Sequence, residues 1–409
     1  MDYKIDGERL VLFLQEEIST KNAKKVEDEM LSIIAEHPEK PLVFDASRLR
    51  YITSSGLRVL LGIQKLKHDQ QGKIDVTEVN RDIIAVFTMT GFTTLMNVIP
   101  KLHEVSVEGK EIIGQGQSST VYRMGGDFII KLYKKDVPKS KIFQEIEFSR
   151  KAFIAGIPTA ITFNVVKCGD SYGAVFEMVD HAATVGHTLT AHPEKFDDIM
   201  SKFVDTYKII HSTDIKKLGG FMSLKDTWLK WADGMGANGS FTPQETDMLK
   251  QMIEAVPDRS TMVHCDYHAG NVMYQNDEII VIDMADIGYG HPIFDLAGGA
   301  FHARYSYFPK RQKVHGMCEA DMLRFWDTLL RMYFNVSDEK KLAEIKEMCS
   351  AFGLLRGAIF PMKHVQIDPE TKAFHVEETR KYLFPRMDWA MEQVHKIEEV
   401  FKWIIHRNK

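Results

Sequence analysis

The chain has 409 residues, more than a typical single domain, so two or three folded units are expected. Hydrophobic residues make up 44% and charged residues 27%, as in ordinary globular proteins, so the chain can form real cores. The net charge of −5, without a long run of like charge, argues against nucleic-acid binding as a main role.

The remaining composition predicts a reducing, aqueous compartment. The four cysteines form no C-x-x-C pair, which indicates neither a disulfide framework nor a zinc site. No apolar run approaches the roughly 20 residues of a membrane helix, and the N-terminus lacks a basic head followed by an apolar core. We therefore expect a soluble cytoplasmic protein without a membrane partner.

The first hundred residues alternate between strand-like and helix-like patterns. Strand patterns are short and β-rich, and helix patterns repeat apolar residues every three or four positions. Such alternation predicts a small α/β unit that closes near Pro100. The expected strands cover residues 10–14, 42–44 and 73–79. One helix is expected over 23–34, a second begins at Gly56, and a third begins near Asp82, with Asn80 as its N-cap.

A known domain type matches this unit. Residues 45–58 (DASRLRYITSSGLR), with Thr90-Gly91-Phe92 further on, resemble STAS domains of the anti-sigma-factor-antagonist type. The resemblance spans residues 1–103 and implies a domain that regulates a neighbour or binds a protein partner.

One serine of this unit is a candidate modification site. In the STAS family the first Ser or Thr of the pair before the glycine accepts a phosphate, and this corresponds to Ser54. A phosphate at a helix N-terminus would meet free amides and the positive end of the helix dipole. Capping of the helix by Ser54 or Ser55 is the alternative. Thr53 stands where many relatives carry Asp.

A short charged linker, residues 101–110, leads to a glycine-rich stretch. Residues 113–122 (IGQGQSSTVY) precede the β-rich run 128–131 (FIIK). Backbone amides of such a turn can approach phosphates, and Lys131 on the next strand can pair with the α and β phosphates. A G-x-G alone would indicate only a tight turn. The predicted phosphate-binding residues are Gly114, Gly116, Ser118, Ser119 and Lys131.

Three polar residues downstream suit phosphoryl transfer to a hydroxyl. Asp266 can accept the proton of the hydroxyl, and Asn271 and Asp283 offer the hard oxygen ligands that Mg²⁺ prefers. Residues 272–282 read as a β-hairpin that would bring Asn271 and Asp283 together. Each residue alone would be an ordinary loop residue. The joint pattern H-x-D-x-H-x-x-N, followed by a hairpin ending in Asp, favours a catalytic segment.

This segment carries a second family resemblance. Residues 264–271 (HCDYHAGN), Ile282-Asp283 and residues 290–297 (GHPIFDLA) resemble the signature of the aminoglycoside phosphotransferase and choline kinase family. The resemblance covers roughly residues 108–400. It implies an α+β bilobal protein-kinase-like fold with a mainly helical C-terminal lobe, ATP or GTP as donor, and Mg²⁺.

The same resemblance implies roles for further residues. An anionic partner should hold Lys131, and Glu145 is favoured over Glu147. Backbone groups near Glu177 and Val179, at the expected hinge, would bind adenine. Supporting roles fall to His264, His268 and Asp295, the last bracing the catalytic loop. Asp286 could assist the metal or the acceptor, or face solvent. His211 is expected to be a packed or capping histidine. Trp228 and Trp231 could line a pocket, but core packing is favoured for both.

The last hundred residues are mostly helical in pattern. A C-terminal helix is predicted by apolar residues at helical spacing: Met387, Met391, Val394, Phe401 and Ile404. An aromatic and basic run at 305–313 could contact an acidic acceptor or the STAS unit, but a solvated loop is the favoured interpretation.

The sequence therefore predicts a STAS domain at 1–103, a nucleotide lobe at 108–181 and a catalytic and acceptor lobe at 182–409. The expected activity is transfer of a γ-phosphate from ATP or GTP, with Mg²⁺, to a small-molecule hydroxyl whose identity the sequence does not give. Two alternatives are a protein kinase that acts on Ser54 of its own or a partner STAS domain, and a non-catalytic nucleotide-binding scaffold.

Overall fold

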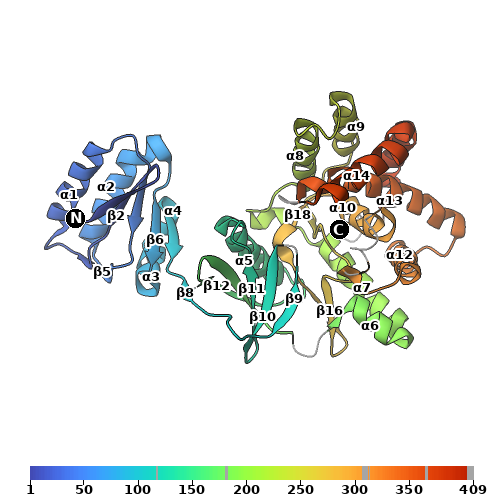
Figure 1. The fold of residues 1–409 in the computed structure, drawn as a ribbon, viewed down its shortest axis with the longest axis horizontal. Coiled ribbons are helices and arrows are strands. Elements are labelled where there is room, and N and C mark those ends of the chain that lie inside the picture. The colour runs from blue at the N-terminus through green and yellow to red at the C-terminus, as the bar shows by residue number, and fades with distance from the viewer. Residues whose placement is uncertain (117, 180–182, 306–311, 313, 364–366, 403–409) are drawn as a thin grey trace. The chain divides into compact units, whose positions relative to one another are not determined.

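The computed structural model divides into two compact units, Met1–Val105 and Ser106–Lys409 (Figure 1). The predicted lobe boundary at 181, most of the run at 305–313 and Ile404 lie outside the described residues. Among the residues that the structure describes, no helix combines the length and apolar composition needed to cross a bilayer. The described residues are 1–116, 118–179, 183–305, 312, 314–363 and 367–402.

The first unit is built on one sheet with the strand order β1-β2-β4-β6-β7. Strands β1 and β2 are antiparallel, and the other neighbouring pairs are parallel. Parallel neighbours need crossover connections, which the helices between them supply. The predicted α/β class of this unit is confirmed. Its main elements are β1 (Tyr3–Asp6), β2 (Arg9–Phe13), α1 (Ala23–Glu36), β4 (Leu42–Asp45), α2 (Ser54–Gln71), β6 (Asp75–Val79), α3 (Arg81–Met89), α4 (Phe92–Leu95) and β7 (Asn97–Pro100).

The start of α2 is fixed by a close backbone approach. A Cβ added at Gly56 would lie 2.5 Å from the carbonyl oxygen of Ile18, closer than real Cβ atoms come, so only glycine fits. Thr53 holds the N-cap position, which leaves neither serine as the cap. Ser54 is the first helical residue and is exposed. In α3, by contrast, the predicted cap is confirmed, because the Asn80 side chain accepts two backbone N–H bonds.

The second unit begins with an antiparallel sheet that includes the order β12-β13-β11-β10-β9 (Figure 1). Lys131 lies on β11, between β10 and β13, and α5 packs on β12 and β13. The elements are β9 (Ile112–Gln115), β10 (Ser119–Gly125), β11 (Phe128–Tyr133), α5 (Lys139–Ile154), β12 (Thr162–Cys168) and β13 (Ser171–Glu177).

The rest of the second unit is mostly helical. Its core is centred on α10 and α13, which pack together, and residues 351–359 of α13 are buried on all sides. A helix buried all round carries little amphipathic signal, so its periodicity is weak. The helices are α6 (Val185–Ala191), α7 (Phe196–Ser212), α8 (Leu224–Ala237), α9 (Pro243–Glu254), α10 (Ile293–Ala300), α12 (Glu319–Phe334), α13 (Glu339–Ile359), α14 (Pro369–Tyr382), α15 (Met387–His395) and α16 (Ile397–Val400).

The predicted C-terminal helix is wrong as a single element. The chain forms α15 and α16, with the junction at Lys396. There the Lys396 N–H bonds the carbonyl of Gln393, three residues back, which tightens the turn. Val394, Ile397 and Phe401 are all buried. The apolar spacing therefore correctly indicates which side of this segment packs on the core, although the segment is two helices.

Candidate active site

The loop that carries Asp266 is held by one buried carboxylate. Strand β15 (Met262–Val263) ends just before the loop, and Asp295, in the first turn of α10, accepts the backbone N–H groups of His264 at 2.8 Å and Cys265 at 2.6 Å. Nε2 of His211 lies 3.0 Å from Asp295, and its Nδ1 lies 2.7 Å from the hydroxyl of Tyr333. Asp295 therefore holds the backbone of the loop that carries Asp266.

This brace holds an unusual backbone conformation. Cys265 has φ +70°, a left-handed value that costs energy for a residue with a side chain. Its N–H is one of the two that Asp295 accepts. The turn after it is closed by the bond from the Asp266 N–H to Nδ1 of His264, at 3.3 Å. The loop conformation that presents Asp266 thus depends on groups buried behind it.

A hairpin brings Asn271 and Asp283 together, as the sequence predicts. It consists of β16 (Val272–Gln275) and β17 (Glu278–Val281), paired antiparallel. The pairing continues where the N–H of Ile282 donates to the carbonyl of Asn271 at 3.0 Å. Asp283 follows directly and has φ +64°. The side-chain amide of Asn271 donates to the carbonyl of Asp266 at 3.1 Å, which joins the hairpin to the loop that carries Asp266.

Lys131 joins the sheet to this hairpin. Its Nζ lies 2.7 Å from Oε1 of Glu145 and 3.0 Å from Oδ1 of Asp283. Burial alone would lower the pKa of Lys131, but the charges of Asp283 and Glu145 outweigh it and hold the pKa well above its ordinary value. The charge of Lys131 in turn lowers the pKa of Asp283. Glu147, the alternative partner, instead pairs with Lys151 and is 58% exposed.

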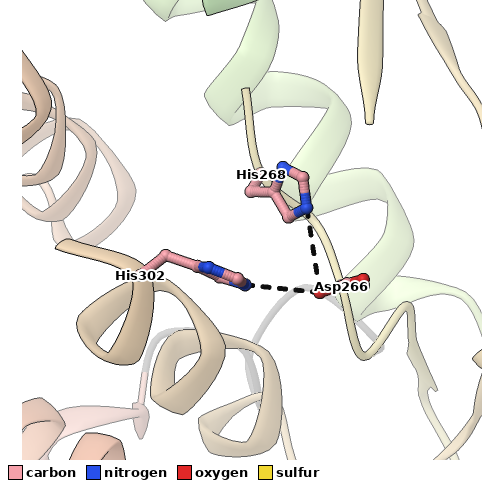
Figure 2. A group of neighbouring side chains, drawn as sticks. All are labelled: Asp266, His268 and His302. Carbon is pink, nitrogen blue, oxygen red and sulfur yellow. Dashed lines mark hydrogen bonds and ion pairs between the residues drawn. The ribbon is translucent and has the colours of Figure 1, made fainter. Parts of the chain in front are cut away.

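Asp266 is surrounded by hydrogen-bond donors. Nζ of Lys363 lies 2.9 Å from its Oδ2. Nε2 of His302 lies 3.3 Å from Oδ1 of Asp266, and Nε2 of His268 lies 3.8 Å from the same oxygen (Figure 2). Burial would raise the pKa of Asp266, but the Lys363 charge and the His302 bond hold it well below its ordinary value. Lys363 also lies 2.9 Å from Asp286.

Asp266, His268 and His302 could also be considered a metal centre, because their ligand atoms lie within 4.8 Å of one another. The hydrogen bonds argue against this. The Gly270 N–H donates to Nδ1 of His268 at 3.0 Å, and burial lowers the pKa of His268 to about 3, so the ring is neutral. A neutral imidazole that accepts at Nδ1 carries its proton on Nε2, which cannot then ligate a metal. The grouping fits a cage of donors around Asp266.

The other predicted nucleotide-binding residues lie in the strands of the sheet or next to their ends. Gly114 is in β9, and the Gly116 N–H donates to the carbonyl of Ser119, which closes the turn. Ser118 is exposed, and its carbonyl accepts the N–H of Lys134. Glu177 ends β13 with its N–H bonded to Ile161, and Val179 is the last described residue before 180–182.

Sequence reasoning missed two residues that contact Asp266. Lys363 lies 97 positions downstream, in the 3-10 helix Phe360–Lys363, and His302 lies in the π-helical turn Phe301–Tyr305. Neither sits in a recognisable motif. A π-helical turn is rare and often marks a functional site, but it cannot be read from periodicity.

Comparison with known proteins gives the family. The model of the phosphotransferase enzyme family (APH) matches residues 111–321, and that of the STAS domain matches residues 1–105. The first match covers more than half of the chain, so the protein belongs to the phosphotransferase enzyme family, and it carries an N-terminal STAS domain. Both predicted resemblances and the predicted fold class are confirmed.

Individual relatives are more distant for the second unit than for the first. The chain is 35% identical over 95 residues, 23% of this chain and 80% of the relative, to the "Putative anti-sigma factor antagonist BtrV" of Bordetella bronchiseptica. Similar solved structures include a choline/ethanolamine kinase family protein from Mesorhizobium loti (15% identity, TM-score 0.46, 70% of this chain and 92% of that chain) and ADP-bound aminoglycoside phosphotransferase APH(2'')-Ib (15% identity, TM-score 0.47, 68% and 95%).

The brace predicts a large effect of Asp295→Asn. An amide has one oxygen, so one of the two loop N–H groups would face an NH₂ group and stay unpaired, at a cost of about 3 kcal/mol. Urea unfolding followed by tryptophan fluorescence measures this, because every tryptophan lies in the second unit. The control is Asp327→Asn, because Asp327 and its partner Lys346 are both partly exposed, and the expected change is below about 1 kcal/mol. Equal effects of the two substitutions would contradict the brace.

Proposed function

We propose that the protein transfers the γ-phosphoryl group of ATP or GTP to a hydroxyl of a small-molecule acceptor. One observation carries the proposal. Asn271 bonds the backbone of Asp266, and Asp283 bonds Lys131, so the proton acceptor, the oxygen ligands and the phosphate-binding lysine are linked by direct contacts. Phosphoryl transfer needs these groups at one centre.

The glycine-rich turn supports nucleotide binding. A Cβ at Gly116 would meet only Ser119, at an ordinary 3.6 Å, and Gly116 is not among the glycines with positive φ. The fold itself therefore does not demand glycine at this position. Close approach of phosphate oxygens to the backbone is a sufficient reason for it. Ser118, Ser119 and Gly114 would line the same turn. The carbonyl of Glu177 and the N–H of Val179 are proposed to bind the base.

Asn271 and Asp283 fit a magnesium ion. Because the Asn271 NH₂ group donates to Asp266, its amide oxygen faces away from that bond, and Asp283 is ionised next to Lys131. A neutral amide oxygen and a carboxylate are hard ligands, and Mg²⁺ held by two protein groups keeps positions for phosphates and water. When bound, Mg²⁺ neutralises charge on the phosphates.

The transfer itself would run through Asp266. The acceptor hydroxyl replaces one of the donors that now occupy the Asp266 oxygens, and hydrogen-bonds to the carboxylate. Its oxygen bonds the γ-phosphorus as the bond to the bridging oxygen breaks, the proton passes to Asp266, and the nucleoside diphosphate leaves with Lys131 on its phosphates. The depressed pKa makes Asp266 chiefly an orienting group that takes the proton late.

The STAS unit is proposed to regulate the transferase or to bind a protein partner. The similarity of this unit to an anti-sigma factor antagonist supports this role. The division of the remaining chain into a nucleotide lobe, 108–181, and an acceptor lobe, 182–409, belongs to the same proposal. The supporting residues His264 and His268 shape the catalytic loop.

Asp266→Asn tests the proposed transfer. The amide keeps the shape of the side chain but cannot take a proton, so kcat should fall about 10²- to 10⁴-fold while affinity for Mg-ADP stays within about twofold. A metabolite-pool screen for nucleotide-dependent phosphorylation supplies the acceptor, and calorimetry supplies the affinity. Unchanged turnover in this variant would refute the role of Asp266.

Two glutamates on α5 form a matched pair for testing Lys131. Glu145→Gln removes the 3% exposed partner of Lys131, so the lysine shifts toward Asp283 and the affinity for Mg-ATP should fall about tenfold or more. Glu147→Gln removes an exposed charge paired with Lys151 and should leave the affinity unchanged. The measurement is calorimetric titration with a non-hydrolysable ATP analogue. Similar losses in both variants would show that Glu145 has no special role.

A second candidate is phosphorylation of Ser54, supported by its exposed place in the first turn of α2, where backbone N–H groups are free for a phosphate. Phosphopeptide mapping after incubation with Mg-ATP separates the two candidates, with the Asp266→Asn protein as control. Transfer to small molecules predicts no phosphate on Ser54. Phosphate on Ser54 in the wild type alone would establish the second candidate.

A further inference from the structure

One buried charge in the second unit has no opposite charge beside it. Arg356, on α13, is 2% exposed, and its Nη1 has no hydrogen-bond partner. No ion pair joins it to another residue in the described part of the chain. A guanidinium stays charged in proteins, and burying it without a partner is costly. The site therefore lacks a group that a ligand could supply.

Aromatic rings surround the guanidinium. Its Cζ lies 5.4 Å from the ring centroid of Trp231, 5.5 Å from that of Phe360 and 5.8 Å from that of Trp228. Ring faces compensate a buried cation only in part. The Nε1 of Trp228 is also buried without a hydrogen-bond partner. Two unsatisfied donors thus lie together, and neither has an acceptor.

The carboxylates of the reaction centre are already paired with another cation. Lys363 binds both Asp266 and Asp286, at 2.9 Å each. Arg356, Phe360 and Lys363 are four and three positions apart along one continuous helical segment, so they share a face. The helical rise separates Arg356 from Lys363 by about 10 Å, a span that one small molecule can bridge.

We propose that Arg356, with Nε1 of Trp228, binds an anionic group of the acceptor, so that the acceptor is a hydroxyl compound bearing a carboxylate or a phosphate. The inference rests on the proposed function and names its substrate class. A guanidinium fork matches the two oxygens of either group. The side chains of Trp231 and Phe360 are themselves partly exposed, so two of the rings that contact Arg356 reach the protein surface.

The same contacts disfavour a cationic acceptor. Aromatic cages bind cations, but here the rings already face the chain's own guanidinium. Acidic residues also attract cations, but Lys363 neutralises the two aspartates nearest the reaction. An amine-bearing acceptor would therefore meet like charge at both ends of the site.

Thermal unfolding of the full chain, followed by tryptophan fluorescence, tests the inference. Saturating Mg-ADP fills the nucleotide site, and four probes with a three-carbon skeleton are compared at equal ionic strength: D-glycerate, glycerol 3-phosphate, glycerol and 3-amino-1,2-propanediol. The variants are Arg356→Met and Arg356→Lys. The control is Arg380→Met, since Arg380 is half-exposed and paired with Glu245.

The expected result has two parts. Without probes, Arg356→Met melts at or above the wild-type temperature, because an apolar side chain replaces an unpartnered buried charge. With probes, only the two anions raise the melting temperature of the wild type and of Arg380→Met, Arg356→Lys keeps part of this rise, and Arg356→Met loses it. Where an anionic probe is turned over, Arg356→Met lowers kcat/KM at least tenfold and leaves Mg-ADP affinity unchanged.

Two results would overturn the inference. One is an equal response of the wild type to all four probes. The other is an anion response that survives in Arg356→Met, together with a lower melting temperature, which would make Arg356 purely structural. Failure of the proposed function is seen separately, as absence of stabilisation by Mg-ADP, and the comparison of the probes is then made without nucleotide.

Discussion

Burial of charge is the constraint on which this site depends. An unpaired ionised group in the protein interior is costly. Three pairings organise the second unit: Lys131 with Glu145 and Asp283, Lys363 with Asp266 and Asp286, and Asp295 with His211 and the loop amides. Each pairing joins elements that are distant in the chain. Together they bring the sheet, the hairpin and the C-terminal helices to one centre.

These pairings also hold two unfavourable backbone conformations in place. Cys265 and Asp283 both have positive φ, which is unfavourable for residues with side chains and persists only where neighbours fix it. The first is fixed by Asp295 and the second follows the hairpin and contacts Lys131. One strained position precedes Asp266 and the other is Asp283 itself, as expected if the proposed transfer needs a carboxylate and an ion ligand in fixed orientations.

The sequence predicts those features that depend on neighbouring residues in the chain. The hairpin after Asn271 follows from alternation and turn chemistry, and the cap at Asn80 follows from its side chain. Lys363 could not be predicted, because it contacts Asp266 from the 3-10 helix that follows α13, and residues 351–359 of α13 are buried on all sides and show little periodicity. The break at Lys396 was missed because buried spacing continues across it. Residues that are far apart in the chain and meet only in the folded structure leave no recognisable pattern in a single sequence.

The central claim is that Asn271 and Asp283 hold the ion beside the nucleotide while Asp266 faces the acceptor. The most direct measurement is an anomalous difference map from crystals of the full chain grown with Mn²⁺ and a non-hydrolysable ATP analogue. The account predicts a manganese peak in direct contact with Asn271 and Asp283 and with the phosphates. A peak between Asp266, His268 and His302, with none at Asn271 and Asp283, would contradict it.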